Sequence, residues 1–305
     1  MQVRELNRII DLRNVVHDDS KAKLERAESS RCTQQLLNPN AVAFLICVDD
    51  EEQYRVCLRY IDALQIPSGC TVEKIAVFGA PSMAEGYQRA MEASTARYKL
   101  YLHQDVYLVH QELLPELLDL FRTYPRLGLV GVLGATLLPT SGVWNVKNPF
   151  HAYGRIWEYW RQGGVYYLLG RANRRRLYLT RFRSFVGDYL PAVVIDGPLM
   201  ATQYDIPWVN SLGGFQLYDQ VQSAEFIKAG LEVGISRQET VWCIHWGPLQ
   251  ERSGDQHRRR NIELHHKAAR FRQLYPEFIG VPARKLYEQY RGAVKWSGNG
   301  PGRIW

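Results

Sequence analysis

The stretch Tyr98–Val109 reads YKLYLHQDVYLV, an aromatic and aliphatic run that is interrupted by His103, Gln104 and Asp105. Aromatic and β-branched residues favour a strand, and polar groups buried within a strand cost free energy unless they have partners. In one continuous strand, His103 and Asp105 face one side of the sheet and Gln104 faces the other. Two ligand-type side chains on one side indicate a metal or phosphate site at a strand end. An edge strand with three solvated polar residues is the competing interpretation.

Strand and helix patterns alternate on both sides of this run. Continuous apolar segments predict buried strands, and amphipathic segments between them predict helices. Such an alternation with short connections is typical of an α/β fold with a wound, mostly parallel sheet flanked by helices. The expected strands are Ala41–Val48, Val72–Phe78 and Leu127–Thr136, and the expected helices cover residues 51–64, 82–97 and 111–123, the second with Ser82 as its N-cap and Glu85 as capping-box partner.

Ligands on wound sheets bind at the carboxyl ends of the strands. This rule places Asp49, Asp50, Ala80 and the group His103–Asp105 on one rim. The glycine-rich fingerprint of dinucleotide-binding folds is missing after the first strand, where two aspartates stand instead. The phosphate-binding loop of P-loop NTPases is missing as well. The residues at this rim therefore predict a site built from carboxylate and imidazole groups, and not a glycine-rich loop that binds phosphate.

The chain is expected to divide into three parts. Residues 1–38 have helical spacing in places and predict a helical extension, and residues 39–250 predict one α/β domain. Within this domain, residues 138–190 show no clean period and are interpreted as an insertion or lid over the sheet rim. Residues 251–305 predict a basic helical extension and a Gly/Pro-rich tail. The later regular elements are expected at 192–202, with a break at Asp196-Gly197, and at 215–230, 231–235 and 240–246, followed by a basic helix at Asn261–Tyr275.

Composition and charge set the remaining bounds. The 305 residues carry a net charge of +7 and five scattered cysteines without a C-x-x-C pair, which suits a reducing cytoplasm. No signal peptide or membrane span is expected. Arginines crowd residues 171–183 and 258–260. Solvated faces are the default interpretation of such clusters, and recognition of a phosphorylated or lipid-linked acceptor is the alternative. Binding to nucleic acid is not expected.

Four acidic or imidazole positions fall at the ends of predicted elements. Asp105 with His245 suits a divalent cation such as Mn²⁺ or Mg²⁺ whose other ligands are diphosphate oxygens and water, since Mn²⁺ also accepts imidazole. Asp219, near the start of its helix, is then available as a general base. The alternatives are ordinary: a turn aspartate at 105, a core histidine at 245 and a helix-capping aspartate at 219.

The run Ser82–Leu108, SMAEGYQRAMEASTARYKLYLHQDVYL, resembles glycosyltransferase-like proteins of family 2 with an L-H-Q-D-V signature, the group that includes the StrF-like domain. Further similarity lies in LGLVGVLGA, IDGPLMATQYDIPW, GFQLYDQVQSAEFIKAG and VWCIHWG, which together span most of residues 41–250. The resemblance implies the GT-A fold, a nucleotide-sugar donor (a UDP- or GDP-sugar) and a divalent metal. It says little about the acceptor, which is a glycan, a lipid-linked molecule or a small molecule.

Site residues carried over by position follow from this resemblance. His103-Gln104-Asp105 stands where related enzymes have Asp-x-Asp, so the implied metal residues are Asp105, His103 and His245, and the implied catalytic base is Asp219. The implied residues of the nucleotide-sugar site are Asp49, Asp50, Ala80, Met83, Gly86, Gln104, Asp196 and Gly197.

The chain also departs from the family pattern. His103 replaces an acid, Gln88 stands in place of an asparagine, and Gln216 stands in place of a histidine. The sequence therefore predicts a metal-dependent, inverting glycosyltransferase, with a non-catalytic nucleotide-sugar or partner binding module as the alternative. A sugar-phosphate nucleotidyltransferase is disfavoured because its glycine-rich loop is missing. Contact with a membrane surface and homo-oligomerisation are left open.

Overall fold

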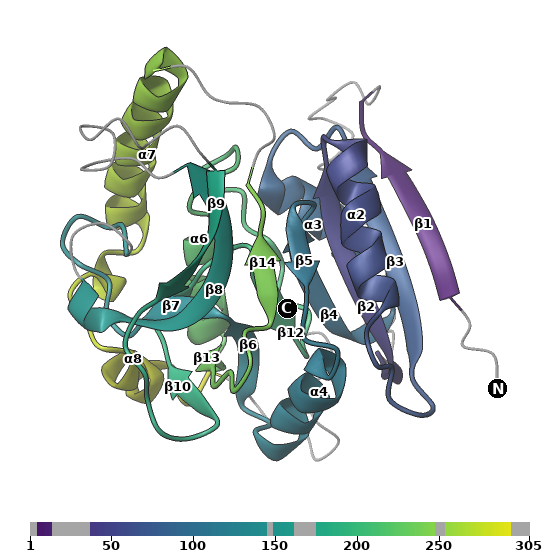
Figure 1. The fold of residues 1–305 in the computed structure, drawn as a ribbon. Helices are drawn as coiled ribbons and strands as arrows, with labels where there is room; N and C mark the ends of the chain where they lie inside the picture. The colour runs from purple at the N-terminus through teal and green to yellow at the C-terminus, as the bar shows by residue number, and fades with distance from the viewer. Residues whose placement is uncertain (1–4, 14–36, 145–148, 162–174, 248–253, 294–305) are drawn as a thin grey trace, which may run out of the picture.

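An eight-stranded sheet runs through the molecule in the computed structural model, which describes residues 5–13, 37–144, 149–161, 175–247 and 254–293 (Figure 1). Two of its strands, β12 and β10, run against the direction of the other six. The predicted α/β class with a mostly parallel sheet is confirmed. In spatial order the strands are β1 (Glu5–Asp11), β3 (Thr71–Phe78), β2 (Asn38–Val48), β4 (Ala96–His103), β12 (Leu199–Thr202), β6 (Leu127–Gly131), β13 (Glu232–Ser236) and β10 (Tyr189–Pro191).

Helices alternate with strands along the chain as the sequence pattern predicts. Asp50 caps the first of them through its side chain, and Ser82 caps the second by accepting the Glu85 N–H. The predicted helix over 82–97 ends early, so that β4 begins at Ala96. The four helices that accompany the sheet are α2 (Glu51–Asp62), α3 (Met83–Glu92), α4 (Leu113–Thr123) and α6 (Tyr218–Lys228).

A second sheet of six strands lies beside the first (Figure 1). Three segments expected as strands each contribute to both sheets: Tyr98–Val109, Leu127–Thr136 and residues 192–202. The run Tyr98–Val109 leaves β4 at His103 and enters β5 after a turn at Gln104 and Asp105. The strands of the second sheet are β11 (Val194–Ile195), β7 (Leu133–Ala135), β8 (Ala152–Arg161), β14 (Cys243–His245) and β5 (Val106–Leu108), and β9 (Arg175–Arg181) pairs with β8.

The prediction of a helical N-terminal extension is wrong for its described part. Residues Glu5–Asp11 form β1, which pairs in parallel with β3 along its full length. The outer edge of β3 offers unpaired backbone groups, and satisfying them outweighs a weak helical spacing. Ile9 stays largely exposed, as expected on an edge strand. Residues 14–36 of the predicted extension lie outside the described residues.

The segment 138–190, predicted as an insertion without regular structure, supplies strands of the second sheet. β8 pairs with β7 on one side, with β14 through Trp157 and Glu158, and with β9 along residues 155–161. Its mixture of aromatic and charged residues hides the strand period, because most of the described side chains of β8 are half-buried and do not alternate strictly between apolar and polar. A 3₁₀ turn at Pro149–His151 precedes β8. Its proposed role as a lid stays a prediction.

The described part of the C-terminal region is helical and basic, as predicted. The expected helix at Asn261–Tyr275 is α7, which begins earlier, at Gly254, and ends at Leu274. A 3₁₀ turn (Pro276–Phe278) and α8 (Ala283–Tyr290) follow, and α8 packs near α6. Within the described residues, no helix combines the length and the apolar composition that crossing a bilayer requires. The division of the chain into three parts stays a prediction.

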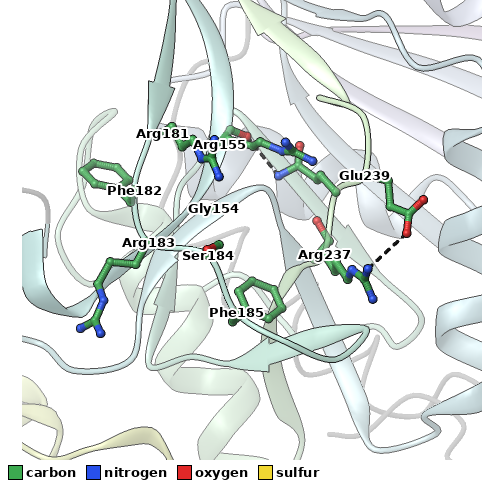
Figure 2. Close-up of a pocket in the computed structure, with 11 residues that line it drawn as sticks. Gly154, Arg155, Arg181, Phe182, Arg183, Ser184, Phe185, Arg237 and Glu239 are labelled. Atoms are coloured by element: carbon green, nitrogen blue, oxygen red, sulfur yellow. Dashed lines mark hydrogen bonds and ion pairs between the residues drawn. The ribbon is translucent and has the colours of Figure 1, made fainter.

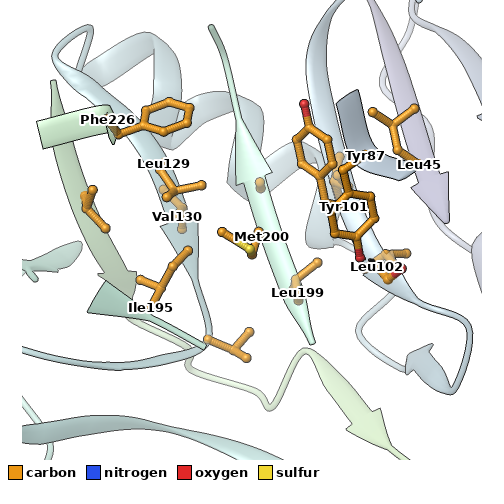
Figure 3. Packing of buried hydrophobic residues seen from close by; sticks show 14 of the residues in the cluster. Leu45, Tyr87, Tyr101, Leu102, Leu129, Val130, Ile195, Leu199, Met200 and Phe226 are labelled. Carbon is orange, nitrogen blue, oxygen red and sulfur yellow. Dashed lines mark hydrogen bonds between the residues drawn. The ribbon is translucent and has the colours of Figure 1, made fainter. Parts of the chain in front are cut away.

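The core lies on both faces of the central strands. Figure 3 shows Met200 of β12 between Val130 of β6 and Tyr101 of β4. Lys99, near the start of β4, forms an ion pair of 2.7 Å with Asp205, which follows the end of β12. Neither side chain is exposed. Lys99 also donates to the carbonyl of Ala96 at 2.6 Å. This pair fixes the start of β4 against the segment that follows β12.

Replacing Asp205 by asparagine should lower the free energy of unfolding by roughly 3 kcal/mol or more, because it leaves a buried ammonium without its carboxylate. Denaturant unfolding measures the change. The control is Glu51→Gln, whose partner Arg55 lies 3.5 Å away at the surface, and which should cost under about 1 kcal/mol. Equal losses in the two variants would contradict a stabilising role for the buried pair.

Candidate functional site

Three polar side chains meet where β4 and β14 end. His245 closes β14, and its strand pairs antiparallel with β5 so that His245 lies opposite Val106, directly after Asp105. His103 Nδ1 lies 3.9 Å from Asp105 Oδ1, and His245 Nε2 lies 3.6 Å from Asp105 Oδ2. One ligand atom from each of the three lies within 4.8 Å of the others. The structure therefore brings together the three residues predicted as metal ligands.

The electrostatics of this cluster centre on Asp105. Burial opposes its ionisation, but the hydrogen bond and charge of His245 and the charge of His103 hold the pKa of Asp105 at about 2. Burial lowers the pKa of His103 to about 4, so His103 is neutral near pH 7. Burial also opposes the charge of His245, yet its contact with Asp105 raises the pKa of His245 above the usual value. Asp105 is thus a carboxylate flanked by one neutral and one more basic imidazole.

Tyr218 orients the neutral imidazole. The ring Nε2 of His103 is hydrogen-bonded with the Tyr218 hydroxyl, which leaves Nδ1 on the side of Asp105. A histidine whose second nitrogen is fixed in this way has a defined ring orientation, as metal-binding histidines do. The donor set of two imidazole nitrogens and one carboxylate fits a divalent cation that accepts imidazole, such as Mn²⁺.

Two carboxyl groups, the half-buried Asp196 and the buried Asp219, lie beside this cluster. The N–H of Gly197 donates to Asp219 Oδ2 at 3.1 Å, and the N–H of Gln220 donates to Oδ1 at 2.9 Å. Burial raises the pKa of Asp219 to about 7, with a further contribution from the neighbouring charge of Asp196. Burial raises the pKa of Asp196 to about 6, while the charge of His245 works in the opposite direction. Both carboxyl groups titrate near neutral pH, which suits proton transfer.

Gly197 connects this pair to the three-residue cluster. A Cβ on Gly197 would overlap the Tyr218 hydroxyl, so only glycine allows Tyr218 to reach His103. Leu217, the residue before α6, is held at φ 59°, a left-handed conformation that is costly for a leucine. Strain of this kind persists where the surrounding structure enforces it. Here it sets the direction in which Tyr218 and Asp219 enter α6.

The predicted donor-binding residues at the end of β2 have structural partners. The side-chain oxygen of Gln104 accepts the N–H groups of Asp49 at 2.7 Å and Asp50 at 2.9 Å, and its amide donates to the Asp49 carboxylate. The Asp50 carboxylate accepts the N–H groups of Glu52 and Gln53 as the N-cap of α2. Asp49 is the exposed acid of the group. Gln104 therefore joins the end of β4 to the end of β2.

Packing accounts for the predicted residues at the start of α3. A Cβ on Gly86 would overlap Cys47 Sγ and the side chain of Ala80, so this glycine lets α3 approach β2 closely. Met83 is buried and donates its N–H to the carbonyl of Gly214 at 3.0 Å. A role of these residues toward a donor stays a prediction.

Three residues at the site are missing from the sequence-based set. Tyr218 holds His103, Glu158 is the strand partner of His245 and adds to the rise of its pKa, and Trp246 donates its N–H to the Asp105 carbonyl at 2.8 Å. Trp246 also stacks on Tyr159 with ring centroids 3.9 Å apart. Tyr218 could be suspected from its place directly before Asp219. Glu158 could not, because the strand that carries it was not predicted.

The comparisons with known proteins identify the class. Residues 43–267 match the model of the glycosyltransferase-like family, which covers most of the chain. The chain therefore belongs to the glycosyltransferase-like family. The narrower StrF-like resemblance stays a prediction.

Other comparisons add little to this assignment. A comparison with curated proteins gives no match. Among solved structures, the chain is similar to a mannosyltransferase from Pyrobaculum calidifontis, solved in complex with GDP-Man and Mn²⁺. The identity is 11% over 90% of this chain and 92% of the other, with a TM-score of 0.39. A similarity of this size says nothing about substrate.

Replacing Gly197 by alanine should displace Tyr218 and lower the free energy of unfolding by about 1–3 kcal/mol, the usual cost of overpacking a buried position. Denaturant unfolding gives the stability, and the imidazole NMR signals of His103 report the loss of its hydrogen bond. Gly292→Ala is the control, because a Cβ there meets only open space. Unchanged His103 signals in the Gly197 variant would contradict the coupling.

Proposed function

We propose that this protein transfers a sugar from a nucleotide-sugar donor to an acceptor hydroxyl with inversion at the anomeric carbon. The observation that carries the proposal is the cluster His103–Asp105–His245 beside two carboxyl groups that titrate near neutral pH, in a chain of the glycosyltransferase-like family. Ligand-type residues and a candidate base thus lie on one rim of the sheet, where wound sheets bind their ligands. This supports a GT-A-type transferase.

His103, Asp105 and His245 are the residues that would hold a divalent metal, Mn²⁺ or Mg²⁺. The imidazole content of the set favours Mn²⁺ over Mg²⁺, which prefers oxygen ligands and retains water. When bound, such a cation neutralises the charge that develops on a departing nucleoside diphosphate. The low pKa of Asp105 keeps this ligand ionised throughout the physiological range. Tyr218 and Trp246 contribute by holding His103 and the Asp105 backbone in place.

Asp219 is the proposed general base. Two backbone N–H groups hold its carboxylate, and burial with Asp196 brings its pKa to about 7. A base with such a pKa accepts a proton from a hydroxyl at neutral pH more readily than an ordinary aspartate. The deprotonated oxygen then attacks the anomeric carbon on the face opposite the leaving diphosphate, which inverts the configuration. Asp196 is the second candidate for this role, since it lies half-buried beside Asp219 and its pKa is raised as well.

The donor would lie along the rim that Gln104 fixes. We propose that Asp49 contacts the nucleoside, because it is the exposed acid at the end of β2, while Asp50 and Gln104 position it. UDP- and GDP-sugars are the expected donors. The four described cysteines are free thiols, which supports a reducing cytoplasm as the location. The acceptor and the oligomeric state are not part of the proposal.

One observation favours a second function. Asp105 and His245 lie 3.6 Å apart and satisfy each other electrostatically without a metal, and a neutral His103 stands where relatives carry an acid. These features suit a module that binds a nucleotide-sugar, or a partner, without transferring the sugar. The two functions differ in turnover and not in donor binding.

A titration with UDP- and GDP-sugars, with and without Mn²⁺, separates them. A donor at a hundred times its dissociation constant should stabilise the protein by about 2.7 kcal/mol, which thermal unfolding detects. Asp105→Asn should remove the part that depends on Mn²⁺, whereas Asp119→Asn on the exposed face of α4 should not. Stabilisation of the wild type without any donor hydrolysis or transfer would favour the binding module. Mn²⁺-dependent stabilisation that survives in Asp105→Asn would contradict the metal site.

The pH dependence of transfer tests the base. Asp219 acts when ionised and its pKa is raised to about 7, so kcat/KM should rise with pH up to about 7 and then level off. Asp219→Asn should reduce kcat by roughly 10²-fold or more while leaving donor affinity unchanged. Asp196→Asn removes the neighbouring charge and should move the rising limb to lower pH. Near-wild-type kcat in Asp219→Asn would show that another group is the base.

A further inference from the structure

A cavity of about 310 Å³ lies where β8 and β9 meet the end of β13, and it shares no residue with the cluster His103–Asp105–His245 or with Asp196 and Asp219. Basic, hydroxyl and aromatic side chains line it. In Figure 2, side chains from β8, from the end of β9 and the segment after it, and from the segment after β13 surround the position of Gly154. The lining residues that the argument uses are Arg155, Arg181, Ser184, Phe185, Arg237 and Glu239.

The charge of this cavity is not compensated within the described residues. Arg155 and Arg181 are direct partners across the antiparallel pair of β8 and β9. Like charges in such positions destabilise a sheet. The lining includes one acid, Glu239. Its carboxylate lies 3.3 Å from the guanidinium group of Arg237 and forms an ion pair with that arginine. No carboxylate of the described part of the chain is seen paired with the guanidinium group of Arg155 or Arg181.

Other lining groups have structural roles that leave the cavity open. Gln238 donates to the carbonyls of Val132 and Arg155 and accepts the N–H of Trp242, so its side chain is engaged with the backbone. Gly154 has φ 96°, and a Cβ there would overlap the Val132 carbonyl, so this position provides a floor without a side chain. Arg183 donates to the Phe150 carbonyl at 2.8 Å and points away from the other side chains in Figure 2.

We propose that this cavity is a binding site for a phosphate-bearing ligand that also offers an apolar portion. Two guanidinium groups match the oxygens of a phosphate with paired, charge-assisted hydrogen bonds, and the Ser184 hydroxyl adds a neutral donor. Phe185 supplies an apolar wall for the part of the ligand next to the phosphate. The bound anion offsets the repulsion between Arg155 and Arg181. The site is independent of sugar transfer.

Calorimetry with phenyl phosphate, in the presence of EDTA to exclude divalent cations, tests the site. Phenyl phosphate should bind saturably, and benzoate, which has the same ring but a single carboxylate charge, should bind at least about tenfold more weakly. Arg155→Gln and Arg181→Gln should each lower the affinity for phenyl phosphate by about tenfold or more, the loss expected for a charge-assisted hydrogen bond. Arg176→Gln, an exposed arginine of β9 outside the cavity, is the matched control and should leave affinity unchanged.

A vesicle arm distinguishes the source of the phosphate. Flotation with phosphatidylcholine vesicles, with and without phosphatidic acid, shows whether a lipid head group occupies the site. Binding of soluble phenyl phosphate that Arg181→Gln weakens indicates a soluble phosphate ester. Binding to phosphatidic acid alone, again lost in Arg181→Gln, indicates a lipid head group. Either result supports the site.

Three results would overturn the proposal. They are no binding of phenyl phosphate or of phosphatidic acid vesicles, equal measurable affinities for benzoate and phenyl phosphate, or a loss of affinity in Arg176→Gln as large as that in Arg155→Gln and Arg181→Gln. Thermal unfolding guards against a folding defect in the variants. Without ligand, Arg181→Gln should unfold no earlier than the wild type, because it removes a like-charge contact between neighbouring strands. Phenyl phosphate should then raise the unfolding temperature of the wild type more than that of the variant.

Discussion

The hydrogen bonds of Gln104 are the interaction on which the rest of the structure depends. Its side-chain oxygen accepts two backbone N–H groups at the end of β2, and its amide holds Asp49. These contacts end β4 at the rim and send the chain into β5, which belongs to the other sheet. If the strand continued straight, β14 would lose its pairing with β5, in which His245 lies opposite Val106, and would keep only its pairing with β8. Gln104 thus ties the end of β2 to the turn at which the chain passes from one sheet to the other and at which Asp105 lies.

Sequence patterns were reliable where burial alone decides structure. Ala41–Val48 is a continuous apolar run that is buried on both faces, and Val72–Phe78 is buried and mostly apolar apart from Glu73 and Lys74. The Asp196-Gly197 break is visible inside an apolar segment. The patterns failed where long-range backbone pairing decides. β1 pairs with the edge of β3, and β8 mixes charged and aromatic residues that are mostly half-buried. The local alternation of apolar and polar residues reveals neither the open edge of β3 nor the second sheet.

The residues of the candidate site also fall into those that the sequence predicts and those that it does not. Asp105, His245 and Asp219 were named from the sequence because acids and imidazoles stand out at strand and helix ends, and the structure brings them to one rim. Tyr218 and Glu158 were missed because their role comes from what they touch and not from their chemistry. Gly86 and Asp50 were expected to face a donor, and the structure gives them close packing and helix capping, two roles that residues next to a site often share.

The division of the site between two sheets has a consequence for how the chain folds. His103 and His245 come from distant parts of the sequence and meet only after β14 has paired with β5 and β8. Closing so long a loop costs entropy, and contacts between distant residues form slowly. A chain in which only β1, β2, β3 and β4 have assembled would therefore contain Asp105 but would lack the pairing of β14 with β5 and β8 that places His245. The rim is therefore complete as a site only when both sheets are in place.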